Sequence, residues 1–185
     1  AAPMPGLRFT ASASASVEPT YAGVGSLYFP DNMFLTRGNV LKLSGAWMRN
    51  DFAGWNQADL TLDNAWLDMV SGGTPVALTG NLVVLGTNPN LSRLVLTNSP
   101  VAVGGNTLLD GGGLVLYPGA TSAASMDVAG NLVLTNKGAL HVTGGITDSV
   151  FEYGAQVDVA GGMVVAANSW VYPYSHPTNG GSARF

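Results

Sequence analysis

The stretch V-A-V-G-G-N at residues 101–106 is the clearest copy of a repeated phrase. It returns as M-D-V-A-G-N at residues 126–131, and V-A-L-T-G-N precedes it at residues 76–81. Looser copies stand at residues 33–39 and 157–162. Each copy is a short strand with alternating apolar side chains that ends on Gly-Asn or Gly-Gly. Such self-similarity at a fixed period indicates a repeat architecture.

The spacing of the copies sets the length of one repeat. Counted from Asn39, the successive intervals are 42, 25, 25 and 31 residues. The two equal intervals predict a unit of 25 residues. We interpret the longer intervals as units that carry loop insertions, of which the segment 44–59 is the largest.

Two further strands follow each Gly-Asn. The second strand is predicted at Val40–Leu43, Leu82–Leu85, Thr107–Leu109, Leu132–Leu134 and Met163–Val165. The third is predicted at Leu60–Leu62, Leu94–Leu96, Leu114–Leu116, Leu140–Val142 and Trp170–Tyr172. Three short strands per unit predict an all-β, right-handed parallel β-helix (solenoid) of about five turns over residues 33–185. The alternative is a β-sandwich with Gly-Asn hairpins, but hairpins would not keep one period through three kinds of strand.

Gly and Asn have a predicted role in every turn of the solenoid. Both adopt the left-handed backbone conformation at low cost, so we expect them to bend the chain between sheets. Stacked turns would place the glycines in one column: Gly38, Gly80, Gly105, Gly130 and Gly161. The asparagines would form a second column, hydrogen-bonded amide to amide along the axis: Asn39, Asn81, Asn106 and Asn131.

The repeated V-x-V-x-G-N phrase, with L-V-L-T-N at residues 94–98 and 132–136, resembles the parallel β-helix repeats of large bacterial secreted and surface proteins. The closest likeness is to autotransporter passengers, and a weaker one is to pectate-lyase-like proteins. The resemblance covers roughly residues 33–185. It implies secretion and a place outside the cell or on its surface, without implying a particular activity.

Composition excludes several classes of protein. The chain has 46% hydrophobic residues, 25 glycines and only 10% charged residues, which is typical of a folded β protein rather than a disordered one. A net charge of -4 with seven Lys and Arg disfavours nucleic acid as a partner. The absence of Cys excludes disulfides, and no apolar run is long enough for a membrane span.

Both ends of the chain carry predictions. Ala1-Ala2-Pro3 resembles a mature N-terminus left by signal-peptide cleavage. Residues 1–32 are interpreted as a cap or an incomplete first turn, because solenoid ends need cover. Ser182–Phe185 falls where the next repeat would begin, so we expect a fragment of a longer chain. The rest of the same polypeptide, or a second chain, would then complete the solenoid.

One outward column is unusually apolar. The middle positions of the second strand are Lys42, Val83, Leu108, Val133 and Val164. Apolar side chains on several successive turns of an outward face are uncommon on a sheet that is exposed to solvent. We therefore predict that the N-terminal segment or a partner chain covers this sheet.

Asp127 and Asp158 occupy equivalent outward positions on successive turns, about 4.8 Å apart by strand spacing. Stacked like charges repel, and a Ca²⁺ ion between them would relieve that repulsion. A general acid and base for glycoside cleavage is a second interpretation. The alternative to both is two solvated carboxylates on an exposed sheet. Ca²⁺ is the one cofactor that the sequence suggests.

Two aromatic groups are candidates for binding carbohydrate. His141 and Tyr172 take equivalent outward positions, with Tyr174 close by, and rings on a flat face can stack on sugars. The alternative is a surface patch or a contact with a neighbouring domain. The second group is Trp47, Trp55 and Trp66, which surround the predicted insertion among four aspartates: Asp51, Asp59, Asp63 and Asp68. Here the alternative is a small core beneath a loop.

Two hypotheses for function remain. In the first, the chain is a structural or adhesive extracellular module of a larger bacterial surface protein. In the second, it is a β-helix that binds or degrades polysaccharide as a lyase or hydrolase. We identify no catalytic residue, because no motif of a known catalytic or phosphate site is present. The small number of Lys and Arg favours the first hypothesis.

Overall fold

The computed structural model describes residues 7–10, 25–28, 40–50, 55–70, 74–90, 92–119, 123–145, 153–175 and 185. Within these ranges the chain forms strands β1 to β19 and no helix. The described residues therefore include no long apolar helix of the kind that crosses a membrane.

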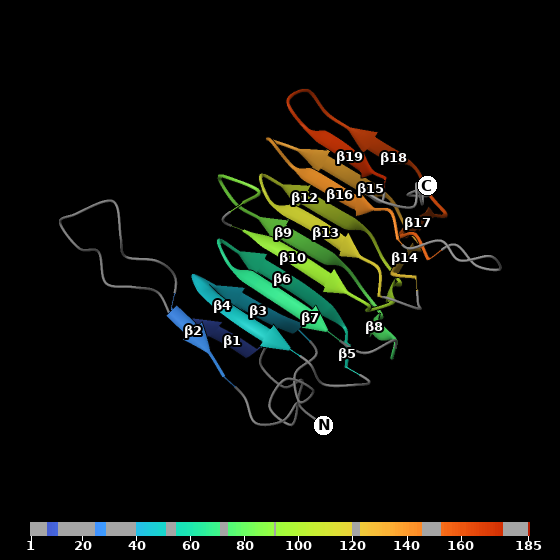
Figure 1. Cartoon of the computed structure of the whole chain (residues 1–185). Coiled ribbons are helices and arrows are strands. Elements are labelled where there is room, and N and C mark those ends of the chain that lie inside the picture. Colours follow the sequence, from blue (N-terminus) through green and yellow to red (C-terminus); the bar gives the residue numbers. More distant parts are fainter. Residues whose placement is uncertain are drawn as a thin grey trace.

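The strands stack into three sheets that we name A, B and C, and every strand pairs with its neighbours in parallel (Figure 1). Sheet A contains β1 (Leu7–Thr10), β3 (Val40–Ser44), β6 (Asp59–Asp63), β9 (Leu82–Leu85), β12 (Thr107–Asp110), β15 (Leu132–Thr135) and β18 (Met163–Val165). Sheet B contains β2 (Gly25–Leu27), β4 (Ala46–Asn50), β7 (Trp66–Val70), β10 (Arg93–Thr97), β13 (Gly113–Tyr117), β16 (Ala139–Thr143) and β19 (Trp170–Tyr174). Sheet C contains β5 (Asn56–Gln57), β8 (Val76–Leu78), β11 (Val101–Val103), β14 (Ser125–Val128) and β17 (Gln156–Val159).

The predicted fold class is confirmed: the molecule is an all-β solenoid of stacked parallel strands. From β5 onward, each turn runs through sheets C, A and B in that order. Side chains alternate along each strand, so every second residue points inward. The buried and intermediate residues of β6 and β9 show this pattern. The inward residues of successive turns form one hydrophobic core, in which Leu62, Leu109 and Leu134 are fully buried. The right-handed sense stays a prediction.

The early turns differ from the prediction. Val40 pairs with Asp59 and Leu60 pairs with Leu82, so the first two intervals are 19 and 22 residues long. The 42-residue interval thus contains two turns rather than one turn with an insertion. The predicted insertion at 44–59 contains regular structure, because β4 and β5 lie within it. The prediction that Leu60–Leu62 is a third strand is wrong. It lies in sheet A as part of β6, and β7 is the strand of that turn in sheet B.

A glycine at the corner explains why the early turn is short. Gly45 has a φ of 57°, which lets one residue join β3 in sheet A to β4 in sheet B. Gly-Asn precedes Val40 and Leu82, but Ala58-Asp59 takes its place at the boundary between the two early turns, so the repeat phrase missed that boundary. Among the described residues, sheets A and B hold seven strands each and sheet C five, against about five turns predicted.

The glycine column is confirmed for Gly80, Gly105, Gly130 and Gly161, whose backbones hydrogen-bond in series at 2.7, 2.9 and 3.0 Å. Ala58 lies beneath Gly80, and Gly38 is outside the described residues. The predicted left-handed conformation is wrong for these four, since none has a positive φ. Left-handed residues instead lie at other bends: Asn64, Asn98, Asn136, Lys137, Asn168, Gly45 and Gly111.

The asparagine column exists, but its hydrogen bonds run from backbone to side chain. Asn106 N–H donates to Asn81 Oδ1, and Asn131 N–H donates to Asn106 Oδ1, each at 2.8 Å. Asp59 takes the first place and accepts from Asn81 N–H at 2.6 Å. Asn39 lies outside the described residues. An amide carbonyl meets the next backbone N–H more readily than a second amide, because all residues of the column share one orientation.

The apolar outward column of sheet A forms as predicted. Lys42, Thr61, Val83, Leu108, Val133 and Val164 lie in register. Val83, Leu108 and Val133 are half-buried, and Val164 is 53% exposed. Of the predicted N-terminal cap, the structure describes β1, β2 and Tyr28, and the two strands extend sheets A and B. Cover of the column by that segment or by a partner stays a prediction.

Candidate functional site

The outer face of sheet B gathers most of the described exposed aromatic side chains. The inward residues of β7, β10, β13 and β16 are leucines, Met69 and Val142, and they fill the core, so the residues on either side point outward. One outward column is Trp66, Arg93, Gly113, Ala139 and Trp170. The next is Asp68, Val95, Val115, His141 and Tyr172.

His141 and two tyrosines form an aromatic cluster on this face. His141 and Tyr172 stack with ring centroids 4.7 Å apart, which matches the spacing of adjacent strands. Tyr174 is nearly parallel to His141, at 5.9 Å and 7°. Because Tyr172 and Tyr174 are two residues apart on β19, their rings lie side by side, 6.2 Å between centroids. The Tyr174 hydroxyl lies 3.4 Å from His141 Nδ1.

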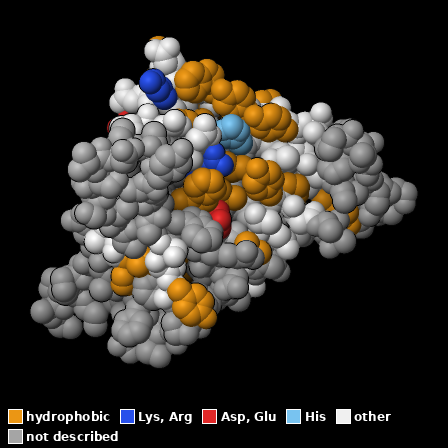
Figure 2. All heavy atoms as spheres, turned by 60° about the vertical axis from the view of Figure 1, so that its left-hand side comes forward, with side chains coloured by type: hydrophobic (Ala, Val, Ile, Leu, Met, Phe, Trp, Pro, Cys, Tyr) orange, Lys and Arg blue, Asp and Glu red, His pale blue; other side chains and the backbone are white. Residues whose placement is uncertain are grey.

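Shallow hollows border the cluster on both sides. One has a volume of about 370 Å³ and is lined by Pro89, Asn90, Ala139, His141, Trp170, Tyr172 and Tyr174. The other, of about 310 Å³, is lined by Val115, Tyr117, His141, Thr143 and Tyr174. Figure 2 shows hydrophobic side chains gathered around the histidine, with a basic side chain beside it. His141 and Tyr174 are therefore a ridge between two open grooves.

Arg93 and Trp66 form a second cluster beside the first hollow. The Arg93 guanidinium lies 4.5 Å from the centroid of the Trp66 ring, and Nη2 donates to Asn90 Oδ1 at 2.7 Å. Its Nε donates to the Pro89 carbonyl at 3.4 Å. Trp66 Nε1 donates to Asp68 Oδ1 at 2.5 Å. Arg93 therefore holds the two loop residues that line the hollow.

Burial and a nearby positive charge disfavour protonation of His141. Partial burial lowers the pKa of the His141 imidazole below its ordinary value of 6.5, and the positive charge of Arg93 lowers it further. Among the described side chains, the Arg93 guanidinium is the positive charge that acts on the imidazole.

The three tryptophans predicted as one group separate in the structure. Trp55 is fully buried in the main core of the solenoid, so its ring is not at the surface for carbohydrate and does not belong to a separate loop core. Trp66 lies on the face of sheet B, and Trp47 pairs with it in register, but the Trp47 side chain lies outside the described part. Sequence spacing could not separate them, because Trp55 itself takes an inward position, directly before β5, in a turn that the repeat phrase did not mark.

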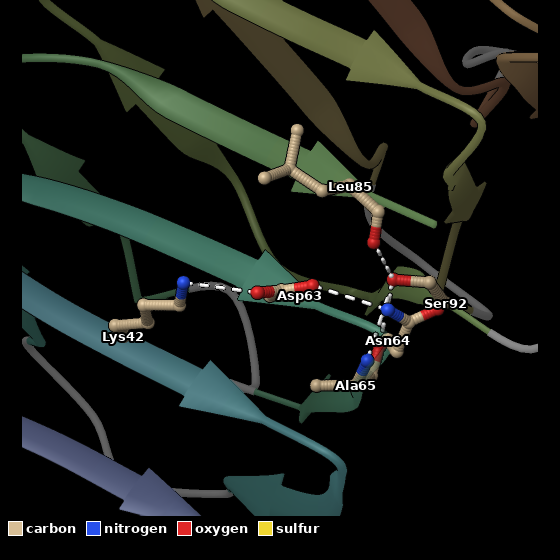
Figure 3. A network of polar contacts seen from close by, with 6 residues as sticks. All are labelled: Lys42, Asp63, Asn64, Ala65, Leu85 and Ser92. Carbon is tan, nitrogen blue, oxygen red and sulfur yellow. Dashed lines mark hydrogen bonds and ion pairs between the residues drawn. The ribbon is translucent and has the colours of Figure 1, made fainter. Parts of the chain in front are cut away.

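The aspartates predicted with those tryptophans also have structural contacts. Asp63 forms an ion pair with Lys42 at 2.9 Å and accepts from Asn64 Nδ2 at 3.1 Å (Figure 3). In the same region, Ser92 Oγ donates to the Leu85 carbonyl of its own turn at 2.6 Å and accepts from Ala65 N–H of the preceding turn at 3.3 Å. Asp59 begins the asparagine ladder, Asp68 binds Trp66, and Asp51 lies outside the described residues.

Asp127 and Asp158 lie on sheet C, away from the aromatic face. They pair in register as predicted, and both are exposed beside a shallow hollow of about 550 Å³. Gln156 Nε2 donates to Asp158 Oδ2 at 2.6 Å. Among the described residues, no group of three or more His, Asp or Glu side chains converges as a metal site would require. Ca²⁺ between the two carboxylates stays a prediction.

Sequence reasoning missed Arg93. It takes the position before L-V-L in its third strand, where the last turn has Trp170. Aligning that outward column across turns would have placed both on one face. Comparisons with protein-family models, curated proteins and solved structures found no match to this chain.

Proposed function

We propose that this chain is an adhesive module that acts outside the cell or on its surface and binds polysaccharide along the outer face of sheet B. The observation that carries this is the cluster of His141, Tyr172 and Tyr174 between two open hollows. Aromatic rings offer apolar area together with a polar edge, as sugar recognition requires.

The shape of the face also supports a linear ligand. The hollows are shallow and follow the stacked strands, and Trp170 and Tyr174 at the last strand are 41% and 46% exposed. A long sugar chain that lies across several turns would make many weak contacts, and together these contacts would raise its affinity. The regular spacing of the turns suits a polymer with its own repeat.

The arrangement favours binding over cleavage. Glycoside hydrolysis needs two carboxyl groups flanking one bond. Asp127 and Asp158 lie on sheet C, and Asp68 on sheet B accepts a hydrogen bond from Trp66. A polysaccharide lyase or hydrolase is the second candidate, and an activity screen on the polymers that bind would detect it.

The test is a glycan array followed by titration with the best polymer. Tyr172→Ala should weaken binding by about tenfold, the effect of losing one aromatic contact. Tyr28→Ala is the matched control, because Tyr28 is 87% exposed and follows β2, at the opposite edge of sheet B. No glycan binding, or equal affinity for both variants and the unchanged chain, would overturn the proposal.

A further inference from the structure

The face of sheet B contains Arg93, which forms no ion pair with a carboxylate of the described residues. Arg93 is half-buried, and the ion pair found among the described residues joins Lys42 to Asp63 on sheet A. Asp68, the outward carboxylate one strand away, binds the Trp66 ring nitrogen instead. A guanidinium in such a place is an unused site for an anion.

Arg93 is held in a fixed orientation. Its plane lies over Trp66, and Nε and Nη2 donate to Pro89 and Asn90. A guanidinium has five N–H donors. Nη1 and the second proton of Nη2 therefore remain available, and together they form an edge that matches the two oxygens of a carboxylate.

The available cation adjoins the aromatic hollow. Pro89 and Asn90, which accept the Arg93 hydrogen bonds, also line the hollow that contains Trp170, Tyr172 and Tyr174. Between Arg93 and Trp170 the outward column holds only Gly113 and Ala139. Pro89 packs against Gly113, so the open space for a ligand is the hollow over Ala139, between the Pro89–Asn90 loop and Trp170.

We propose that this face selects an acidic polysaccharide whose sugars carry carboxylate groups, with Arg93 binding the carboxylate and the ring of Trp170 or Tyr174 contacting the sugar. This inference rests on the proposed function, because it names the class of ligand for the same face. The influence of Arg93 on the pKa of His141 supports it, since the positive charge reaches the aromatic cluster.

The experiment compares alginate with its methyl ester, which keeps the sugar chain and removes the charge. The unchanged protein should bind alginate at least tenfold more tightly, and that preference should fall as sodium chloride is raised. Arg93→Gln should lower the affinity for alginate roughly 10- to 100-fold and remove the preference. Arg93→Lys should retain part of it, because the charge remains without the two-pronged geometry.

Controls separate this inference from the proposed function. Lys42→Gln removes the same charge on sheet A and should keep the preference for alginate. Circular dichroism of Arg93→Gln checks that the packing on Trp66 is not required for folding. Equal binding of alginate and its ester would overturn the inference and leave the adhesive function standing. Tighter binding of dextran sulfate than of alginate would overturn the carboxylate assignment. Absence of binding to any polysaccharide would overturn both proposals.

Discussion

At Gly105, an added Cβ would lie 2.5 Å from Asn81 Oδ1 and 2.8 Å from the Gly80 carbonyl oxygen. Gly130 is equally tight against Asn106 Oδ1 and the Gly105 carbonyl oxygen. The glycines of this column are therefore required by the close approach of stacked backbones, and not by a left-handed conformation.

Gly105→Ala should destabilise the protein by about 1–3 kcal/mol, the usual cost of overpacking a tight site. Gly162→Ala is the control, because its Cβ would meet only Asn131 Oδ1, at 3.4 Å. Urea unfolding of both variants measures the difference. Equal stability of the two would show that the backbones separate without cost.

His141 links stability to pH. Its pKa is lowered in the folded protein by burial and by Arg93, while the unfolded chain keeps the ordinary value of 6.5. Above pH 6.5 both states are neutral at this ring. As the pH falls below that value, the unfolded state takes up the proton first, so stability decreases until the pH reaches the folded pKa.

His141→Gln should remove that part of the acid-induced loss of stability. The groups facing His141 are Arg93 on β10, Val115 on β13, and Tyr172 and Tyr174 on β19, so no described carboxylate there offsets the effect. Chemical unfolding at intervals from about pH 8 to pH 5 measures it. Parallel pH profiles for the variant and the unchanged chain would refute the prediction.

Among the elements, the asparagine ladder ties each turn to the next. Asp59, Asn81, Asn106 and Asn131 each accept a hydrogen bond from the backbone of the following turn, and the ladder ends at Gly162 N–H. A side-chain oxygen at this position therefore accepts a hydrogen bond from a backbone N–H group that would otherwise have no protein acceptor at the corner.

Asn106→Ala should cost about 0.5–1.5 kcal/mol, because Asn131 N–H loses its acceptor. Asn106→Asp should be close to neutral, since a carboxylate fills the same role at Asp59. Hydrogen exchange at the Asn131 amide should accelerate in the alanine variant alone. Unchanged exchange there would contradict the role assigned to the ladder.

Across the whole molecule, the last described turn is less covered than the others. The inward-facing Met163 and Val165 are 40% and 45% exposed, whereas the equivalent Leu132 and Leu134 are fully buried. Phe185 borders a small hollow with Val157, Val159 and Met163. Exposed apolar residues beside free strand edges favour pairing with another β-stranded segment.

We predict concentration-dependent association of this chain through that surface. Val165→Lys should reduce it, because the charge would have to be buried in the contact. Val83→Lys, on the outer face of sheet A, is the control. Light scattering over a hundredfold range of concentration measures the mass. A monomer at every concentration would contradict the prediction that a second chain completes the solenoid.

The 25-residue period of residues 76–131 was sufficient to predict three strands per turn, parallel pairing and the inward side of each strand. Alternation and turn length are local properties, so they can be read along one chain. The boundary between the two short early turns could not be read in this way, because Ala58-Asp59 stands there in place of Gly-Asn and the register depends on stacking against later turns. The sequence also did not predict that Trp55 is buried, or that Arg93, Trp66 and Tyr172 lie on one face. Residues far apart in sequence become neighbours only when the coils stack, since the hydrogen bonds between strands set which columns share a surface.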